Sequence, residues 1–233
     1  MQKIKILGPG LLYAAAAIGV SHLVQSTRAG AEFGYQLVWI VLLANVIKYP
    51  IFKVGPLYTM ATGKTLLEGY QNIGKPIMAL FYFATLATMF TVQAAVTIVS
   101  GGLAINLLGL DISIALTSTI LLILSAIILF VGKYNILDNL IKVIIAVLSV
   151  STLASVFVGQ FVVFPKPDMA LEFSWNNNGH MLFLIALIGW MPAPLDVPIW
   201  QSMWTSEKKK SNQVTFKDAI FDLNFGYIAT AVL

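Results

Sequence analysis

Residues 189–198, Gly-Trp-Met-Pro-Ala-Pro-Leu-Asp-Val-Pro, place one carboxylate and three prolines inside an otherwise apolar stretch over 181–204. In a bilayer, an aspartate near the centre costs about 2.5–3.5 kcal/mol, and each proline removes a backbone hydrogen-bond donor. Lipid alone does not tolerate such a segment. A discontinuous helix accommodates it, because its freed carbonyls and Asp196 then line a water- or ion-filled cavity within a helix bundle. The segment therefore predicts the binding site of a transporter.

A second polar interruption lies in the first apolar stretch of the chain. After an apolar opening at 11–18, the sequence continues as Gly-Val-Ser-His at 19–22 and turns polar from Gln25 to Arg28. Gly19 weakens a helix at this point. Interruptions at corresponding places in two spans indicate a substrate site near the membrane midplane. The two interruptions are therefore expected to face each other.

The composition is that of an integral membrane protein. Hydrophobic residues make up 58% of the chain and charged residues 10%, with a mean hydropathy of +0.86, whereas soluble domains are about 25% charged. The absence of cysteine excludes a disulfide framework and a thiolate metal site. The net charge of +4 does not indicate a nucleic-acid partner, because the lysines fall in short connections between apolar stretches.

Six apolar stretches are long enough to cross a bilayer. They cover 11–30, 35–60, 77–103, 112–131, 140–164 and 181–204. A seventh begins near 219 and reaches 233 after 15 residues, short of the roughly 20 that a spanning helix needs. We expect residues 1–233 to form a single transmembrane domain that is the N-terminal part of a longer transporter.

The basic residues predict the orientation of these spans. With the N-terminus in the cytoplasm, nine basic residues lie in cytoplasmic segments and two, Arg28 and Lys166, lie outside. The nine are Lys3, Lys5, Lys64, Lys75, Lys133, Lys208, Lys209, Lys210 and Lys217. This bias follows the positive-inside rule. Residues 207–213 are then a solvated cytoplasmic loop, and the protein is expected in a bacterial plasma membrane.

Four short motifs resemble the Nramp family of divalent metal transporters (natural resistance-associated macrophage proteins). They are Gly-Pro-Gly at 8–10, Arg-Ala-Gly-Ala-Glu-Phe-Gly-Tyr-Gln-Leu-Val-Trp at 28–39, Leu-Leu-Ala-Asn at 42–45 and Met-Pro at 191–192. The resemblance covers spans one to six and the start of the seventh. It implies an all-α, LeuT-like helix bundle in which ions bind between discontinuous spans one and six. A divalent cation is then the substrate, and no cofactor is expected.

The chain departs from the family's motifs at the proposed ligands. Where the family carries Asp-Pro-Gly-Asn in span one, this sequence has Gly19 in place of the Asp and His22 in place of the Asn. The family's Met-Pro-His in span six becomes Met-Pro-Ala at 191–193. If the register shifts by three residues, Asp196 takes the position of the family's His. Both registers stay open.

The altered set predicts a mixed metal site. Its candidate ligands are the His22 imidazole, the Met191 thioether, the Asp196 carboxylate, and the carbonyls of Gly19 and Ala193. Imidazole and thioether favour softer transition metals, whereas carboxylate, carbonyl and water suit magnesium, calcium and manganese. Manganese-like or iron-like ions and magnesium therefore remain open, as does loss of metal binding. The oligomeric state has no signal in the sequence.

Each candidate ligand also has a structural interpretation. Asp196 suits the cap of the second half of a broken helix, His22 suits a hydrogen bond between helices, and Met191 suits a gap in a core. A LeuT-type carrier of a small organic solute, such as an amino acid, would use the same broken helices. An enzyme is the less favoured class, because Ser21 and His22 are only sequence neighbours and no His-Glu-x-x-His motif occurs.

Two further features bear on transport. The third span, 77–103, contains no Asp or Glu, so no carboxylate relay runs along it and coupling to a proton gradient is expected to be weak or absent. Lys48 lies deep in the second span. It is expected to compensate a buried carboxylate such as Asp196.

Overall fold

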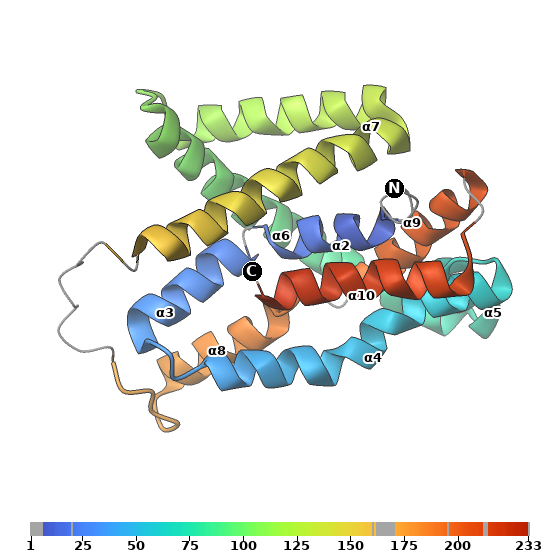
Figure 1. The fold of residues 1–233 in the computed structure, drawn as a ribbon, viewed down its shortest axis with the longest axis horizontal. Helices are drawn as coiled ribbons and strands as arrows, with labels where there is room; N and C mark the ends of the chain where they lie inside the picture. The colour runs from blue at the N-terminus through green and yellow to red at the C-terminus, as the bar shows by residue number, and fades with distance from the viewer. Residues whose placement is uncertain are drawn as a thin grey trace. The chain divides into compact units, whose positions relative to one another are not determined.

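The computed structural model describes residues 7–19, 21–159, 161, 171–194, 196–211 and 214–232. The side chains at 21–23, 132–139, 142 and 211 lie outside this description. The described residues form helices without strands (Figure 1). The all-α prediction is therefore confirmed. The chain divides into two units, Met1–Leu66 with Leu140–Leu233, and Leu67–Asn139.

The first span is interrupted where the sequence predicts it. Helix α2 (Pro9–Ala17) begins with Pro9 in its first turn, a position that needs no backbone N–H donor. It ends before a turn at Ile18 and Gly19. A π-helix, η1 (Ser21–Ser26), and the short helix α3 (Thr27–Phe33) then continue the chain. The apolar stretch at 11–30 is thus three short helical pieces rather than one helix.

The sixth span is also broken. Helix α8 (Asn178–Trp190) starts at Asn177, whose side chain accepts hydrogen bonds from the N–H groups of Gly179 and His180. It ends at the Met-Pro motif, and helix α9 (Val197–Ser211) begins six residues after Met191. The proline-rich segment between them has no helical assignment in its described residues. The predicted discontinuity is therefore present.

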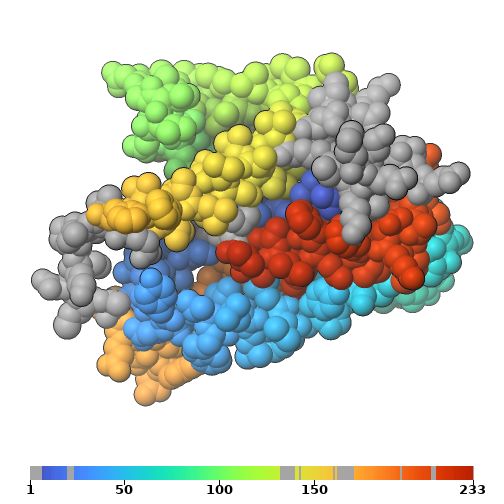
Figure 2. Space-filling model, in the orientation of Figure 1, coloured from blue at the N-terminus to red at the C-terminus, as the bar shows by residue number. Residues whose placement is uncertain are grey.

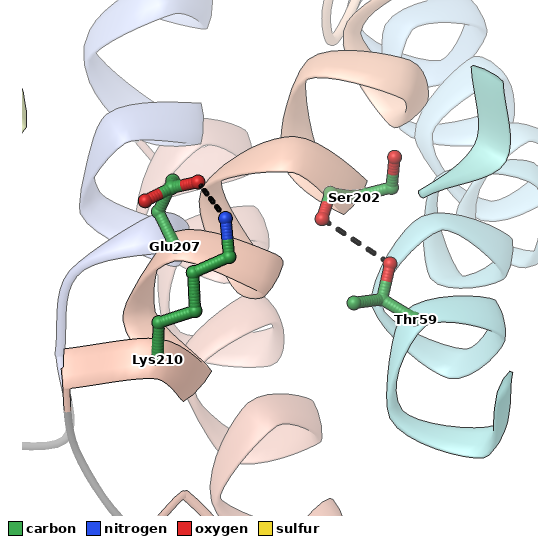
Figure 3. A network of polar contacts seen from close by, with 4 residues as sticks. All are labelled: Thr59, Ser202, Glu207 and Lys210. Atoms are coloured by element: carbon green, nitrogen blue, oxygen red, sulfur yellow. Dashed lines mark hydrogen bonds and ion pairs between the residues drawn. The ribbon is translucent and has the colours of Figure 1, made fainter. Parts of the chain in front are cut away.

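Helix α9 extends further than expected. Residues 207–213 were expected to form a solvated loop, but 207–211 belong to α9, and Lys208 is 7% exposed. The loop prediction is wrong there. Lysines near a helix C-terminus interact favourably with its dipole, and Glu207 pairs with Lys210 at 2.6 Å within the same helix (Figure 3). These local interactions favour continued helix.

The second span is helix α4 (Val38–Thr62), and the seventh stretch is helix α10 (Phe216–Val232). A short helix that the sequence analysis did not predict, α5 (Leu66–Ile73), follows α4. A capping box starts α10: Thr215 Oγ1 accepts from the Asp218 N–H, and Asp218 Oδ2 accepts from the Thr215 N–H at 3.0 Å. Hydrogen bonds from the Thr215 hydroxyl and N–H lower the pKa of Asp218.

The unit Leu67–Asn139 contains helix α6 (Lys75–Leu108) and the first part of helix α7 (Ile114–Gly159). This one continuous helix covers the span expected at 112–131 from Ile114 and the span expected at 140–164 up to Gly159, so the non-helical connection expected between them is absent. Residues 160 and 162–164 lie outside the described part of the chain. Within this unit, Ser118 Oγ of α7 bonds the Thr97 carbonyl of α6 at 3.3 Å.

Several helices have the length and composition of membrane spans. Among the described residues, three are long and apolar enough: Val38–Thr62, Lys75–Leu108 and Ile114–Val131. Val143–Gly159 and Asn178–Trp190 are shorter apolar helices. The long helices carry large exposed side chains, such as Phe83, Phe90 and Phe130, which suit contact with lipid.

In the larger unit, α10 lies along α2 and α4 (Figures 1 and 2), and α9 packs against the same two helices. Helices α2 and α10 approach closely because both carry glycine at the contact. A Cβ on Gly10 would overlap the Asp222 carbonyl, and a Cβ on Gly226 would overlap the Gly10 carbonyl. Helices α4 and α9 are tied by Thr59, whose hydroxyl donates to the Ser202 carbonyl at 3.2 Å (Figure 3).

Candidate functional site

Buried contacts bring the two interrupted spans together. Tyr13 and Ala17, on α2, share one buried cluster with Ala193 from the break in span six and Val197 from the start of α9. Phe52 of α4 and Tyr227 of α10 complete this cluster. The last turn of α2 therefore lies beside the break between α8 and α9. This is the arrangement that a site between two broken helices requires.

Asp196 lies immediately before α9 with its side chain exposed. Its Oδ2 accepts a hydrogen bond from Trp200 Nε1 at 3.2 Å, and its carbonyl accepts from the Ile199 N–H at 2.9 Å. A negative charge at this place is favoured by the positive end of the α9 dipole. The position therefore suits both the capping role and the ligand role that the sequence left open.

The other sequence-predicted ligands lie in different surroundings. Met191 is 1% exposed, and its side chain belongs to an apolar cluster with Phe33 and Leu187. Ala193 is fully buried, and Gly19 is half-buried in the turn after α2. The side chain of His22 lies outside the described residues. The structure thus places backbone of both breaks near the centre of the unit and the Met191 thioether among apolar groups.

Lys48 caps the C-terminal end of α8. Its ammonium donates to the carbonyls of Ile188, Gly189 and Met191 at 2.5, 3.2 and 2.8 Å. The expected partner was a buried carboxylate such as Asp196, and that expectation is wrong. The last carbonyls of a helix have no partner within it and carry the negative end of the dipole. Because α8 ends at Trp190 inside the bundle, these carbonyls need a donor from another helix, and α4 supplies it.

Buried polar atoms near the breaks escaped the sequence analysis. Within the described residues, five buried side-chain atoms have no hydrogen-bond partner: Tyr13 Oη, Gln25 Oε1, Asn45 Oδ1, and Oε1 and Nε2 of Gln201. Gln201 is 1% exposed and follows Val197 by one turn of α9. Buried polar groups are usually paired, and each exception requires an explanation. The signal in the sequence was the position of Gln201, whose amide lies one helical turn after the apolar Val197 and so on the same face of α9.

Asp222, on α10, was also missed. Its side chain is 3% exposed, and its two oxygens accept hydrogen bonds from the N–H groups of Gly8 at 3.0 Å and Gly10 at 2.7 Å. Nearby, the Lys208 ammonium meets the Leu7 carbonyl at 3.5 Å. A carboxylate is favourable at a helix N-terminus, where N–H groups lack partners. Asp222 therefore anchors the first turn of α2 to α10.

The available metal ligands are mostly oxygen atoms. No three side chains of His, Asp or Glu gather within the part of the chain that the structure describes. The candidate donors around the breaks are the Asp196 carboxylate, the amide oxygens of Asn45 and Gln201, and backbone carbonyls. Oxygen donors of this kind suit hard cations such as magnesium, calcium and manganese.

Known proteins resemble this chain over most of its length. The profile of the family described as natural resistance-associated macrophage protein-like (Nramp) matches residues 10–233. An uncharacterized protein of Pasteurella multocida is 38% identical over the whole chain, which spans 54% of that relative. The divalent metal cation transporters MntH of Mycobacterium tuberculosis and Yersinia pestis are each 26% identical, over 71% and 72% of this chain and 38% and 40% of their own length.

No solved structure matches the chain. The chain spans about half the length of the Pasteurella relative. The family profile nevertheless covers both interrupted spans and the helices that pack against them. Its match and the long apolar helices lead to one conclusion: the chain belongs to the Nramp family of integral membrane proteins.

Proposed function

We propose that the full protein is a secondary transporter that moves a divalent cation across a bacterial plasma membrane, with its N-terminus in the cytoplasm. Family membership supports this function, and so do relatives named as divalent metal cation transporters. The observation that carries the proposal is the contact between the last turn of α2 and the break between α8 and α9. Broken helices placed side by side supply carbonyl oxygens and dipole ends for an ion.

In this proposal the ion binds between the two breaks. The Asp196 carboxylate supplies the charge, the carbonyls of Gly19 and Ala193 supply neutral oxygens, and His22 supplies an imidazole. Met191, the first residue of the break, supplies its thioether. A single carboxylate gives a hard dication less compensation than two would, so the ion keeps part of its water shell. The oxygen donors suit manganese(II) and magnesium, and the imidazole and thioether suit a softer transition metal such as iron(II).

A second candidate function is the transport of a small organic solute such as an amino acid. The observation that favours it is the aromatic cluster beside Ala193. Tyr13 stacks on Tyr227 with ring centroids 5.6 Å apart and meets Phe52 edge-on at 5.4 Å. Sites for organic ligands are commonly lined by such rings. Solute identity therefore separates the two candidates.

The test is a flux assay on the full-length protein in liposomes. Manganese(II), iron(II), magnesium, calcium and zinc are offered separately, with amino acids as the organic alternative. Accumulation of at least one dication is expected. Accumulation of an amino acid without any dication would replace the proposal by the second candidate.

Asp196→Asn tests the role of the carboxylate. The amide keeps the shape of the side chain and caps a helix about equally well, but it removes the charge that a dication needs. We expect normal expression and at least tenfold lower cation flux. Asp218→Asn is the matched control, since Asp218 also lies at the start of a helix but in the capping box of α10. Near-normal flux in a folded Asp196→Asn variant would remove Asp196 from the site.

Weak coupling to protons is part of the same proposal. Helix α6 carries the third span and contains no Asp or Glu. Asp196 and His22 are then the nearby groups left to carry a proton. Both are also the candidate metal ligands, and a bound dication disfavours their protonation. An imposed pH gradient is expected not to concentrate metal in sealed vesicles with the membrane potential clamped.

A further inference from the structure

Lys48 is a charged side chain that the proposed carrier does not yet use. An ammonium has three N–H donors and no acceptor. Its bonds to the carbonyls of Ile188, Gly189 and Met191 account for all three donors. None remains to hold the carboxylate of an organic solute, so Lys48 is not a substrate anchor of that kind.

The three carbonyls are themselves oxygen ligands for a cation. They lie at the end of α8, where the unpaired carbonyls of a helix carry partial negative charge. Met191 is the first residue of the break, so the ammonium lies at the edge of the proposed ion site. Carbonyls at the ends of unwound helices coordinate ions in carriers built from broken helices. Here a side chain of the protein already occupies that position.

We propose that Lys48 is a resident cation that competes with a divalent ion for the carbonyl oxygens at the C-terminal end of α8. Two cations cannot share these oxygens without repulsion. The ammonium thereby lowers the affinity of the site for a dication and selects against ions that need a full carbonyl shell. This inference rests on the proposed function, since it takes the break between α8 and α9 as the place of the cargo.

The test is manganese(II) binding to purified full-length protein, measured by isothermal titration calorimetry. Lys48→Met removes the charge and keeps an unbranched side chain. The carbonyls at the end of α8 that accept from Lys48 then become free for the metal. We expect at least tenfold tighter binding than in the wild type. Lys48→Arg keeps the charge and is expected to bind as weakly as the wild type.

Lys53→Gln is the matched control for net charge. Lys53 belongs to the same helix, but its ammonium lies over the Tyr49 ring, 5.7 Å from the ring centroid. The substitution removes the same charge without touching α8. Manganese affinity is expected to stay within twofold of the wild type, and an increase equal to that of Lys48→Met would reduce the effect to overall charge and overturn the proposal.

A second measurement needs no substitution and therefore stands if Lys48→Met fails to fold. The wild type is labelled with an amine-specific reagent, with and without saturating manganese(II), and each lysine is followed by mass spectrometry. Competition predicts at least threefold faster labelling of Lys48 with the metal present and no change at Lys53. Unchanged labelling of Lys48 in protein that has bound manganese would overturn the proposal.

The outcomes separate this inference from the proposed function. Equal manganese affinity in the wild type and Lys48→Met, with cation flux intact, overturns the competition and leaves the transport proposal standing. If only Lys48→Met binds manganese tightly and the wild type moves no dication, the competition is supported and the proposed cargo is removed. Absence of binding in both proteins overturns both.

Discussion

The start of α2 and the end of α8 are held by charges of opposite sign, a buried carboxylate and a half-buried ammonium. At the start of α2, the Asp222 carboxylate accepts from the N–H groups of Gly8 and Gly10. At the end of α8, the Lys48 ammonium donates to backbone carbonyls. Each charge comes from a neighbouring helix and meets the dipole end of opposite sign. Both charges thus pair with helix ends.

The difference between the two sites lies in what else the backbone groups can bind. Amide N–H groups at the start of α2 do not coordinate a metal, so Asp222 has no cation competing for its partners and serves as an anchor. Carbonyls at the end of α8 are metal ligands, so Lys48 holds a position that a cation can also take. A side-chain charge bonded to backbone groups is therefore structural at the start of α2, and it bears on ion specificity at the end of α8.

Asp222→Ala is expected to have the largest effect on stability. The substitution leaves two buried N–H groups without acceptors, at about 1–3 kcal/mol each. We expect a total loss of about 3 kcal/mol in the free energy of unfolding, measured by denaturation in detergent. Hydrogen exchange should also accelerate across α2. Manganese(II) that binds the folded state should stabilise the wild type and the variant equally, so the difference between them should remain. A difference that disappears when metal is added would contradict the contrast between the two helix ends.

Gly226→Ala is expected to have a smaller effect at the same contact. Its Cβ would overlap the Gly10 carbonyl, so α2 and α10 must move apart, and overpacking of this kind costs roughly 1–3 kcal/mol. Gly30→Ala is the control, because nothing lies within 4 Å of the Cβ at that helical position. Thermal unfolding of the two variants measures the difference. Equal stability would show that close packing does not hold α2 to α10.

Thr215→Ala is expected to have the smallest effect. Loss of a helix cap costs about 1 kcal/mol, and the pKa of Asp218 should rise towards its ordinary value as the Thr215 hydroxyl bond is lost. A lowered pKa in the folded state stabilises the protein above the ordinary pKa, and this contribution is lost as pH falls through the lowered value. The stability of the variant should therefore fall less steeply with acidification than that of the wild type, measured by thermal unfolding below about pH 4. An unchanged acid-side profile would exclude the capping box as its source.

The sequence was sufficient for features that depend on local chemistry. Prolines and Asp196 in one apolar stretch, and Gly19 with polar neighbours in another, predicted both breaks because a lipid-facing helix does not tolerate them. The membrane class followed from composition, and the family followed from short motifs that the profile match confirms.

Features that depend on tertiary contacts were missed. Lys48 was assigned a carboxylate partner because the sequence does not show that α8 ends beside α4. Asp222 stood in an apolar stretch without an evident role, since its partners are more than 200 residues away in sequence. The burial of Lys208 was also missed, since its contact with Leu7 joins residues 201 positions apart in sequence.

The most direct test of the central claim is the position of manganese(II) bound to the full-length protein, located by anomalous X-ray diffraction. The account predicts a peak between the two breaks, about 2–2.6 Å from a carboxylate oxygen of Asp196. The peak should be stronger in Lys48→Met than in the wild type at equal metal concentration. A peak away from both breaks would contradict the account.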